Sequence, residues 1–170
     1  MTGRQLALPL ELTVADLDPT DLGLLDWSGG PEHLRALAEA VGRREAGEVE
    51  LVVITVGNGE SVAVGAVDFA KRPDAGELWM LSVREAWQSL GLGTILIEAL
   101  EVRIVARGRP YATLGVEHDN PRAAALYRRL GYRENGTALD DWAIGTDRRY
   151  VTVCTTMIKS LRPTADVDQV

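Results

Sequence analysis

The chain has 170 residues, 46% of them hydrophobic and 25% charged, which is typical of one globular domain with a single core. Its formal net charge of −7 argues against nucleic-acid binding, which depends on clustered Lys and Arg, and permits a cationic substrate. The chain shows neither a signal-peptide pattern nor a run of about eighteen apolar residues, so we expect a cytoplasmic protein without a membrane partner.

The first half of the chain predicts a strand, a helix and then three more strands. Residues 8–17 read as a strand, and residues 18–30 are loop-like with a short helix inside. A helix from Pro31 to about residue 47 follows, because its apolar residues recur three and four positions apart. Strands are then expected at residues 48–56, 61–70 and 77–83. Tight turns join these three strands, so they form an antiparallel meander.

The second half of the chain alternates between helix and strand. Residues 92–106 predict a helix, residues 110–117 a strand, and a second helix begins at Asn120 and Pro121. The remaining expected elements are a short strand at 132–137, a loop at 139–149, a closing strand at 150–158 and a flexible tail at 160–170. A strand–helix–strand crossover implies a parallel pair. The fold class predicted is therefore a mixed α/β sheet with helices on both faces, in a single domain at 1–159.

Metal and thiol chemistry are not indicated by the sequence. The single cysteine, Cys154, lies in an apolar alternating run, so we interpret it as a packed side chain rather than a nucleophile. The two histidines, His33 and His118, show no metal-ligand spacing with it, and no metal is expected.

The chemically informative segment joins the strand at 77–83 to the helix at 92–106. Its sequence is Gln88-Ser89-Leu90-Gly91-Leu92-Gly93-Thr94. Glycines let main-chain amides approach a ligand, and the first turn of a helix offers unpaired N–H groups at its positive end. The segment therefore predicts a phosphate or diphosphate site. It matches neither the Walker A nor the dinucleotide pattern. The alternative is a plain strand–helix turn whose glycines only allow tight packing.

Two blocks of the sequence resemble the GCN5-related N-acetyltransferase (GNAT) superfamily. Gln88-x-x-Gly91-x-Gly93 is similar to the family's Gln/Arg-x-x-Gly-x-Gly/Ala signature. The segment from Asn120 to Tyr132, with its Leu-Tyr and Gly-Tyr pairs, is similar to the second family block. Both blocks lie on the expected elements at a suitable spacing. The order of elements matches the family over about residues 8–159.

The resemblance implies a GNAT-like, mostly antiparallel sheet splayed between its fourth and fifth strands, with acetyl-CoA bound in the splay. Tyr127 resembles the general acid that protonates the leaving thiolate; the alternative is a packed aromatic side chain. The cofactor-binding residues implied are Leu81, Ser82, Val83, Gln88, Ser89, Leu90, Gly91, Leu92, Gly93, Thr94, Asn120 and Tyr127.

The activity implied is acetyl transfer from acetyl-CoA to a primary amine of a small molecule or peptide, by direct attack in a ternary complex. The base is left open among Glu117, His118, Glu77 and a water chain. A non-catalytic acyl-CoA-binding module would carry the same cofactor loop. A homodimer is a family-level expectation.

The loops at 18–30 and 139–149 are expected to select the acceptor, because loops carry specificity. Their aromatic and acidic residues are candidates for an amine-binding mouth: Trp27, Trp142, Asp26, Asp140 and Asp141. The alternative for the tryptophans is that they anchor the loops or contact another subunit.

Overall fold

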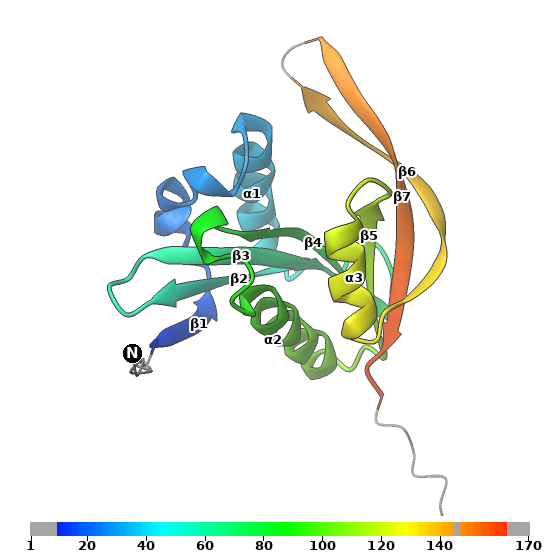
Figure 1. The fold of residues 1–170 in the computed structure, drawn as a ribbon, viewed down its shortest axis with the longest axis horizontal. Coiled ribbons are helices and arrows are strands. Elements are labelled where there is room, and N and C mark those ends of the chain that lie inside the picture. Colours follow the sequence, from blue (N-terminus) through cyan, green and yellow to red (C-terminus); the bar gives the residue numbers. More distant parts are fainter. Residues whose placement is uncertain (1–9, 145–146, 163–170) are drawn as a thin grey trace, which may run out of the picture.

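The computed structural model describes residues 10–144 and 147–162 and contains one seven-stranded sheet of order β1-β2-β3-β4-β5-β7-β6 (Figure 1). The strands are β1 Leu12–Asp16, β2 Val49–Val56, β3 Ser61–Asp68, β4 Ala75–Val83, β5 Tyr111–Glu117, β6 Arg133–Ile144 and β7 Arg148–Ser160. Neighbouring strands are antiparallel except for the parallel pair β4–β5. This confirms the predicted mixed sheet, with its meander and its single parallel crossover.

Three helices cover the two faces of the sheet: α1 Pro31–Arg44 on one side, and α2 Leu92–Ala106 with α3 Pro121–Arg129 on the other (Figure 1). Strand β2 shows the division directly. Leu51 and Val53 pack in the cluster under α1, whereas Val52 and Ile54 pack in the cluster under α2. Because successive side chains of a strand point to opposite faces, β2 is buried on both sides. All eight residues of β3 are buried as well. The short 3-10 helices are η1 Pro19–Leu24, η2 Asp26–Ser28 and η3 Glu85–Trp87.

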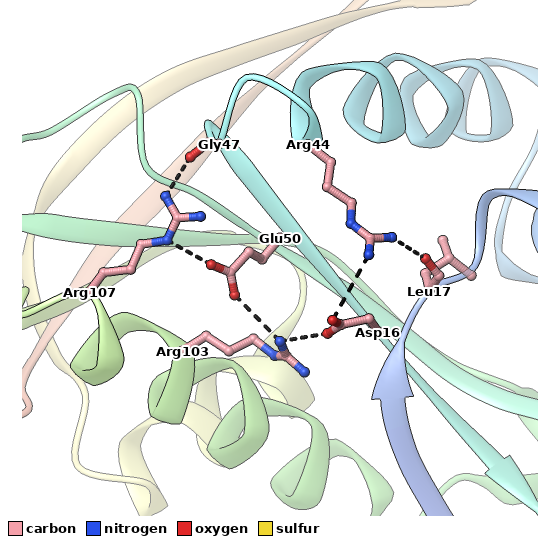
Figure 2. Close-up of polar contacts among 7 residues, drawn as sticks. All are labelled: Asp16, Leu17, Arg44, Gly47, Glu50, Arg103 and Arg107. Carbon is pink, nitrogen blue, oxygen red and sulfur yellow. Dashed lines mark hydrogen bonds and ion pairs between the residues drawn. The ribbon is translucent and has the colours of Figure 1, made fainter.

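A chain of charged side chains braces the edge of the sheet where β1, β2, α1 and α2 meet (Figure 2). Arg103 on α2 pairs with Asp16 at 2.6 Å and with Glu50 at 3.5 Å. Arg107 pairs with the same Glu50 at 2.7 Å, and Arg44 donates to a main-chain carbonyl beside β1 at 2.7 Å. These partly exposed pairs are individually weak. As a network they fix the position of the short strand β1.

Strands β4 and β5 pair only over their first halves. The paired residues run from Ala75 opposite Tyr111 to Leu78 opposite Leu114. Beyond Leu78, β4 stays on β3 alone, and its register on β3 shifts, with Met80 in an unusual positive-φ conformation of 51°. An extra residue in one strand bends that strand locally. The bulge therefore turns the end of β4 away from β5 and opens a seam, as predicted.

Gly65 on β3 lies opposite this bulge and is required by close packing. A Cβ atom at position 65 would lie 2.7 Å from the Leu81 side chain, 3.1 Å from Leu100 and 3.2 Å from Leu96. The absence of a side chain on β3 therefore makes room for the bulged end of β4. The width of the seam depends on both strands.

The prediction of a loop at 139–149 is wrong, because its first six residues belong to β6 and its last two belong to β7. The two strands form an arm that extends beyond the body of the molecule (Figure 1). Trp142 stacks there on Tyr150, its cross-strand partner, with ring centroids 4.7 Å apart. Residues 139–142 of β6 are exposed and need no apolar face, so this part of the chain lacks the alternation that marks a half-buried strand. The predicted tail at 160–170 lies mostly outside the described residues, and Ser160 still belongs to β7.

Candidate active site

The seam between β4 and β5 opens into a cleft of about 780 Å³ on the α2 and α3 side of the sheet. Its walls are the end of β4, the segment before α2, the first turns of α2 and one side of α3. Every residue that the resemblance assigned to the cofactor lines this cleft except Ser82 and Leu90. The Ser82 hydroxyl faces the other side of the sheet and donates to the Ser28 carbonyl at 3.0 Å. Leu90 is 61% exposed.

The N-terminus of α2 forms one wall of the cleft. Gly91 caps the helix in the left-handed region with φ 86°, a conformation that glycine adopts at little cost. The first intrahelical donor is the Thr94 amide, which bonds to the Gly91 carbonyl at 3.0 Å. The amides of Leu92 and Gly93 therefore have no intrahelical acceptor and lie at the positive end of the helix dipole. This wall can bind an anion.

The facing wall is α3, which Asn120 begins. The Asn120 side chain accepts a hydrogen bond from the Ala123 amide at 3.1 Å, so it caps the helix and also lines the cleft. One helical face then brings Tyr127 to the inner end of the cleft. Its ring packs edge-on against Tyr132, with centroids 6.1 Å apart. Tyr127 is thus both a packed aromatic residue and a residue of the cleft wall.

Tyr127 is only 8% exposed. Burial disfavours the charged phenolate and raises the pKa of Tyr127 above its ordinary value. The phenol is therefore protonated at neutral pH and has a proton to donate. Behind it, the Tyr132 hydroxyl donates to the buried Glu101 at 2.8 Å, and Lys159 pairs with the same carboxylate at 2.7 Å. These contacts hold the ring against which Tyr127 packs.

Glu117 and His118 do not line this cleft. Glu117 ends β5, and burial raises the pKa of its carboxyl, as do the charge and hydrogen bond of Asp119 and the charge of Asp140. The structure therefore brings Glu117 together with two other acids rather than with Tyr127. His118 donates its main-chain amide to the Val153 carbonyl at 3.2 Å. Asp119 was not predicted; its place between Glu117 and Asn120 was the only available signal.

A second cavity of about 380 Å³ lies beside this acidic group. Thr113, Gly115, Cys154 and Asp140 contribute to its lining. Thr113 and Gly115 of β5 alternate with Leu114 and Val116, which pack in the core under α2, so this part of the lining lies on the opposite face of the sheet. Leu114 and Met157 also border the cavity, as do Lys71, Arg72 and Glu77. Cys154 is buried, and burial together with the nearby acids raises the pKa of its thiol. A protonated thiol is a poor nucleophile, in line with the packed role predicted.

The tryptophans of the predicted mouth differ in their surroundings. Trp27 packs against the cluster under α1, and the Arg84 guanidinium lies 5.9 Å from its ring centroid. It anchors the segment that carries η2, as the alternative interpretation held. Trp142 lies on the arm and is 39% exposed. Among the described residues, no helix is long and apolar enough to span a bilayer, and no group of three or more potential metal ligands is present.

Comparisons with known proteins agree with this architecture. The ribosomal-protein-S18-alanine N-acetyltransferase from Escherichia coli superposes with a TM-score of 0.71 at 23% identity, covering 94% of this chain and 100% of that one. A putative GNAT acetyltransferase from Desulfovibrio desulfuricans gives a TM-score of 0.72 at 14% identity, covering 88% and 99% of the two chains. At these identities the likeness concerns the fold.

Sequence comparisons identify the family. Mycothiol acetyltransferase from Jonesia denitrificans is 45% identical over 56 residues, which span 33% of this chain but only 18% of that protein. The sequence model of the Acetyltransferase (GNAT) family matches residues 20–132, a stretch that includes the α2 loop and the whole of α3. This chain therefore belongs to the GNAT family of acetyltransferases.

Proposed function

We propose that this chain is an N-acetyltransferase that uses acetyl-CoA as the acyl donor and a primary amine of a small molecule or peptide as the acceptor. The observation that carries the proposal is the shape of one cleft, which runs from the anion-binding start of α2 to the protonated phenol of Tyr127. A thioester that also carries a diphosphate needs an anion-binding site at one end of the cleft and a proton donor at the other. The names of related proteins, which include a spermidine and a protein-alanine acetyltransferase, agree with an amine acceptor.

The residues of the cleft fit such a donor. The amides of Leu92 and Gly93 would hold the diphosphate, in the manner of other helix N-termini. Leu81 and Val83 line the cleft beyond the point where β4 leaves β5, so the main-chain edge of β4 that β5 no longer covers can face the amide-containing pantetheine arm. The Val83 carbonyl already accepts a hydrogen bond from the Gln88 side chain at 3.1 Å. Gly93 has little spare room, since a Cβ atom there would lie 3.2 Å from the Leu126 side chain.

Acetyl-CoA supplies a thioester carbonyl that is attacked directly by the neutral amine. A main-chain N–H near Leu81 or Val83 stabilises the negative charge that develops on the carbonyl oxygen. As the carbon–nitrogen bond forms and the carbon–sulfur bond breaks, Tyr127 would donate its phenolic proton to the departing sulfur. The raised pKa of Tyr127 keeps that proton in place until the sulfur becomes a strong enough base. The acylated nitrogen would then lose its extra proton, which would return to the Tyr127 oxygen through water.

The acceptor approaches from the acidic side of the seam in this proposal. The carboxyl groups of Glu117, Asp119 and Asp140 create a negative potential that attracts an ammonium ion. Glu117 accepts the ammonium proton, and because it does not line the donor cleft, it does so through water. His118, a water chain alone, and Glu77, which lines the second cavity and pairs with Lys71, are the other routes for this proton. A cytoplasmic location and a homodimer stay predictions from the sequence.

Kinetics of CoA release test the proposal. The wild-type protein would be given acetyl-CoA and a panel of amines, including a polyamine and a peptide with a free N-terminus, and thiol release would be followed. Turnover with at least one amine is expected. Tight binding of acetyl-CoA without turnover on any amine would support a non-catalytic acyl-CoA-binding module instead. A calorimetric preference for ATP or NAD over acetyl-CoA would contradict both functions.

A further inference from the structure

Arg122 in the first turn of α3 reaches across the mouth of the cleft to the segment before α2. Its Nη1 donates to the Gln88 side-chain oxygen at 2.9 Å, and its Nη2 donates to the Ser89 hydroxyl at 2.9 Å. The Gln88 amide nitrogen in turn donates to the Val83 carbonyl at 3.1 Å, which turns the Gln88 oxygen toward the arginine. The guanidinium is therefore held at a defined place beside the α2 N-terminus.

Both partners of Arg122 are neutral. Eight of the other described arginines pair with carboxylates, as Arg43 does with Asp68 at 2.8 Å and Arg103 does with Asp16 at 2.6 Å, whereas Arg109 donates to main-chain carbonyls. Arg122 has no carboxylate within ion-pair distance among the described residues. A guanidinium forms its strongest hydrogen bonds with anions, through two parallel N–H groups.

The position of this charge is unfavourable unless an anion joins it. Arg122 lies in the first turn of α3 and contacts the segment that leads into α2, so its charge is near the positive ends of two helix dipoles. Cations are destabilised at such ends, whereas anions are stabilised there. The free amides of Leu92 and Gly93 line the same cleft. Two helix ends and a guanidinium thus converge on one space.

We infer that Arg122 is a binding residue for the phosphate oxygens of the acyl donor, and that Gln88 and Ser89 hold its guanidinium in position before the donor binds. This inference rests on the proposed function. When the donor binds, Arg122 exchanges two neutral acceptors for charged phosphate oxygens. The exchange adds charge-assisted hydrogen bonds to a site that otherwise uses main-chain amides. The shared chemistry is a phosphate group, which the donor carries both as a diphosphate and as a 3′-phosphate on its ribose.

Calorimetric titration of acetyl-CoA into wild-type protein, Arg122→Gln and Arg128→Gln tests the inference. Arg128 is a matched control on the same helix, since it pairs with Glu134 and does not line the cleft. Arg122→Gln is expected to raise the Kd about tenfold, the effect of losing one charge-assisted hydrogen bond. Arg122→Lys is expected to restore part of the affinity, because it keeps the charge but not the two parallel donors. Arg128→Gln should stay within about twofold of wild type.

Dephospho-CoA, which lacks the 3′-phosphate, distinguishes the two sources of phosphate. A loss of affinity by Arg122→Gln for acetyl-CoA alone would place Arg122 on the 3′-phosphate, and an equal loss for both ligands would place it on the diphosphate; either supports the inference. A steeper salt dependence in wild type than in Arg122→Gln would also support it. Unchanged Kd values in a folded Arg122→Gln variant would overturn it and leave the proposed function intact. Failure of the wild type to bind acetyl-CoA would instead refute the proposed function.

Discussion

The two faces of the sheet at the β4–β5 seam carry different polar groups. The face under α2 and α3 presents main-chain amides, two helix N-termini and Arg122 to its cleft, which suits an anion. The opposite face carries the acidic cluster of Glu117, Asp119 and Asp140. Its cavity is lined by Glu77 and Asp140 together with Lys71 and Arg72. Under the proposed function, the donor would bind on the first face and the amine acceptor would approach from the second. A substitution on one face should therefore affect one ligand and spare the other.

Removing the Tyr127 hydroxyl is expected to have the largest effect and to separate chemistry from binding. Tyr127→Phe should lower kcat about 100-fold, since it removes the proton donor for the leaving sulfur. The Kd for acetyl-CoA should change little, because the ring still packs against Tyr132. Stopped-time assays of CoA release and calorimetry measure the two quantities. Tyr111→Phe is the control, since Tyr111 lies outside the cleft; an undiminished kcat in Tyr127→Phe would remove the acid role.

A side chain on Gly93 should affect only ligand binding on the face of the sheet under α2 and α3, which we call the donor face. Gly93→Val places a branched side chain where a Cβ atom already lies 3.2 Å from Leu126, beside the amides proposed to hold the diphosphate. We expect the Kd for acetyl-CoA to rise about 30-fold, in the range of overpacking costs. Gly42→Val on α1 is the matched control, because position 42 has open space around it. Equal affinity in a folded Gly93→Val protein would mean that these glycines serve packing alone.

Glu101, the buried carboxylate behind the donor face, should affect the stability of the fold rather than the binding of a ligand. Glu101→Gln removes the charge that pairs with Lys159 and accepts from the Tyr132 hydroxyl. We expect unfolding free energy to fall by about 2 kcal/mol, less than a fully buried pair because Lys159 is partly exposed. Urea denaturation of Glu101→Gln and of the exposed Glu98→Gln measures this. Equal midpoints for the two variants would show that the buried contacts contribute little.

The smallest expected effect concerns the acidic face and the pH profile. Burial, Asp119 and Asp140 raise the pKa of Glu117, and a base works only when deprotonated, so kcat/KM should rise with pH through that raised pKa. Asp140→Asn removes one negative neighbour and should move this rising part of the pH profile of kcat/KM to lower pH by about 0.5 pH units. Asp21→Asn serves as the control. If the rise of kcat/KM with pH persisted unchanged in Glu117→Gln, the base would be another of the candidates, such as His118 or water.

The donor face was predictable because its signals are local in sequence. The bounds of α2 at Leu92 and Ala106 match the prediction, since apolar periodicity and flanking glycines mark them. The loop of Gly91 and Gly93 follows directly from that boundary. Most residues assigned by resemblance to the cofactor line one cleft for the same reason.

The acidic face and the arm were not predictable in the same way. Asp140 reaches Glu117 only because β6 and β7 continue as a paired arm, and Asp140 lies opposite Thr152 in that arm. The exposed residues of β6 leave no apolar alternation in the sequence, so its extension beyond residue 137 was not predicted. The bridge from Arg122 to Gln88 joins positions 34 residues apart, which no local pattern records.

Gly65 has a consequence for enzymes engineered from this scaffold. It never touches the cleft, yet any side chain there must displace Leu81, because Leu96 and Leu100 close the other directions. Leu81 forms part of the wall beside which the thioester would lie. Acyl-chain length preference, for instance acetyl over propionyl, would then depend on a strand that no ligand contacts, and a mutant library confined to the visible cleft would miss it.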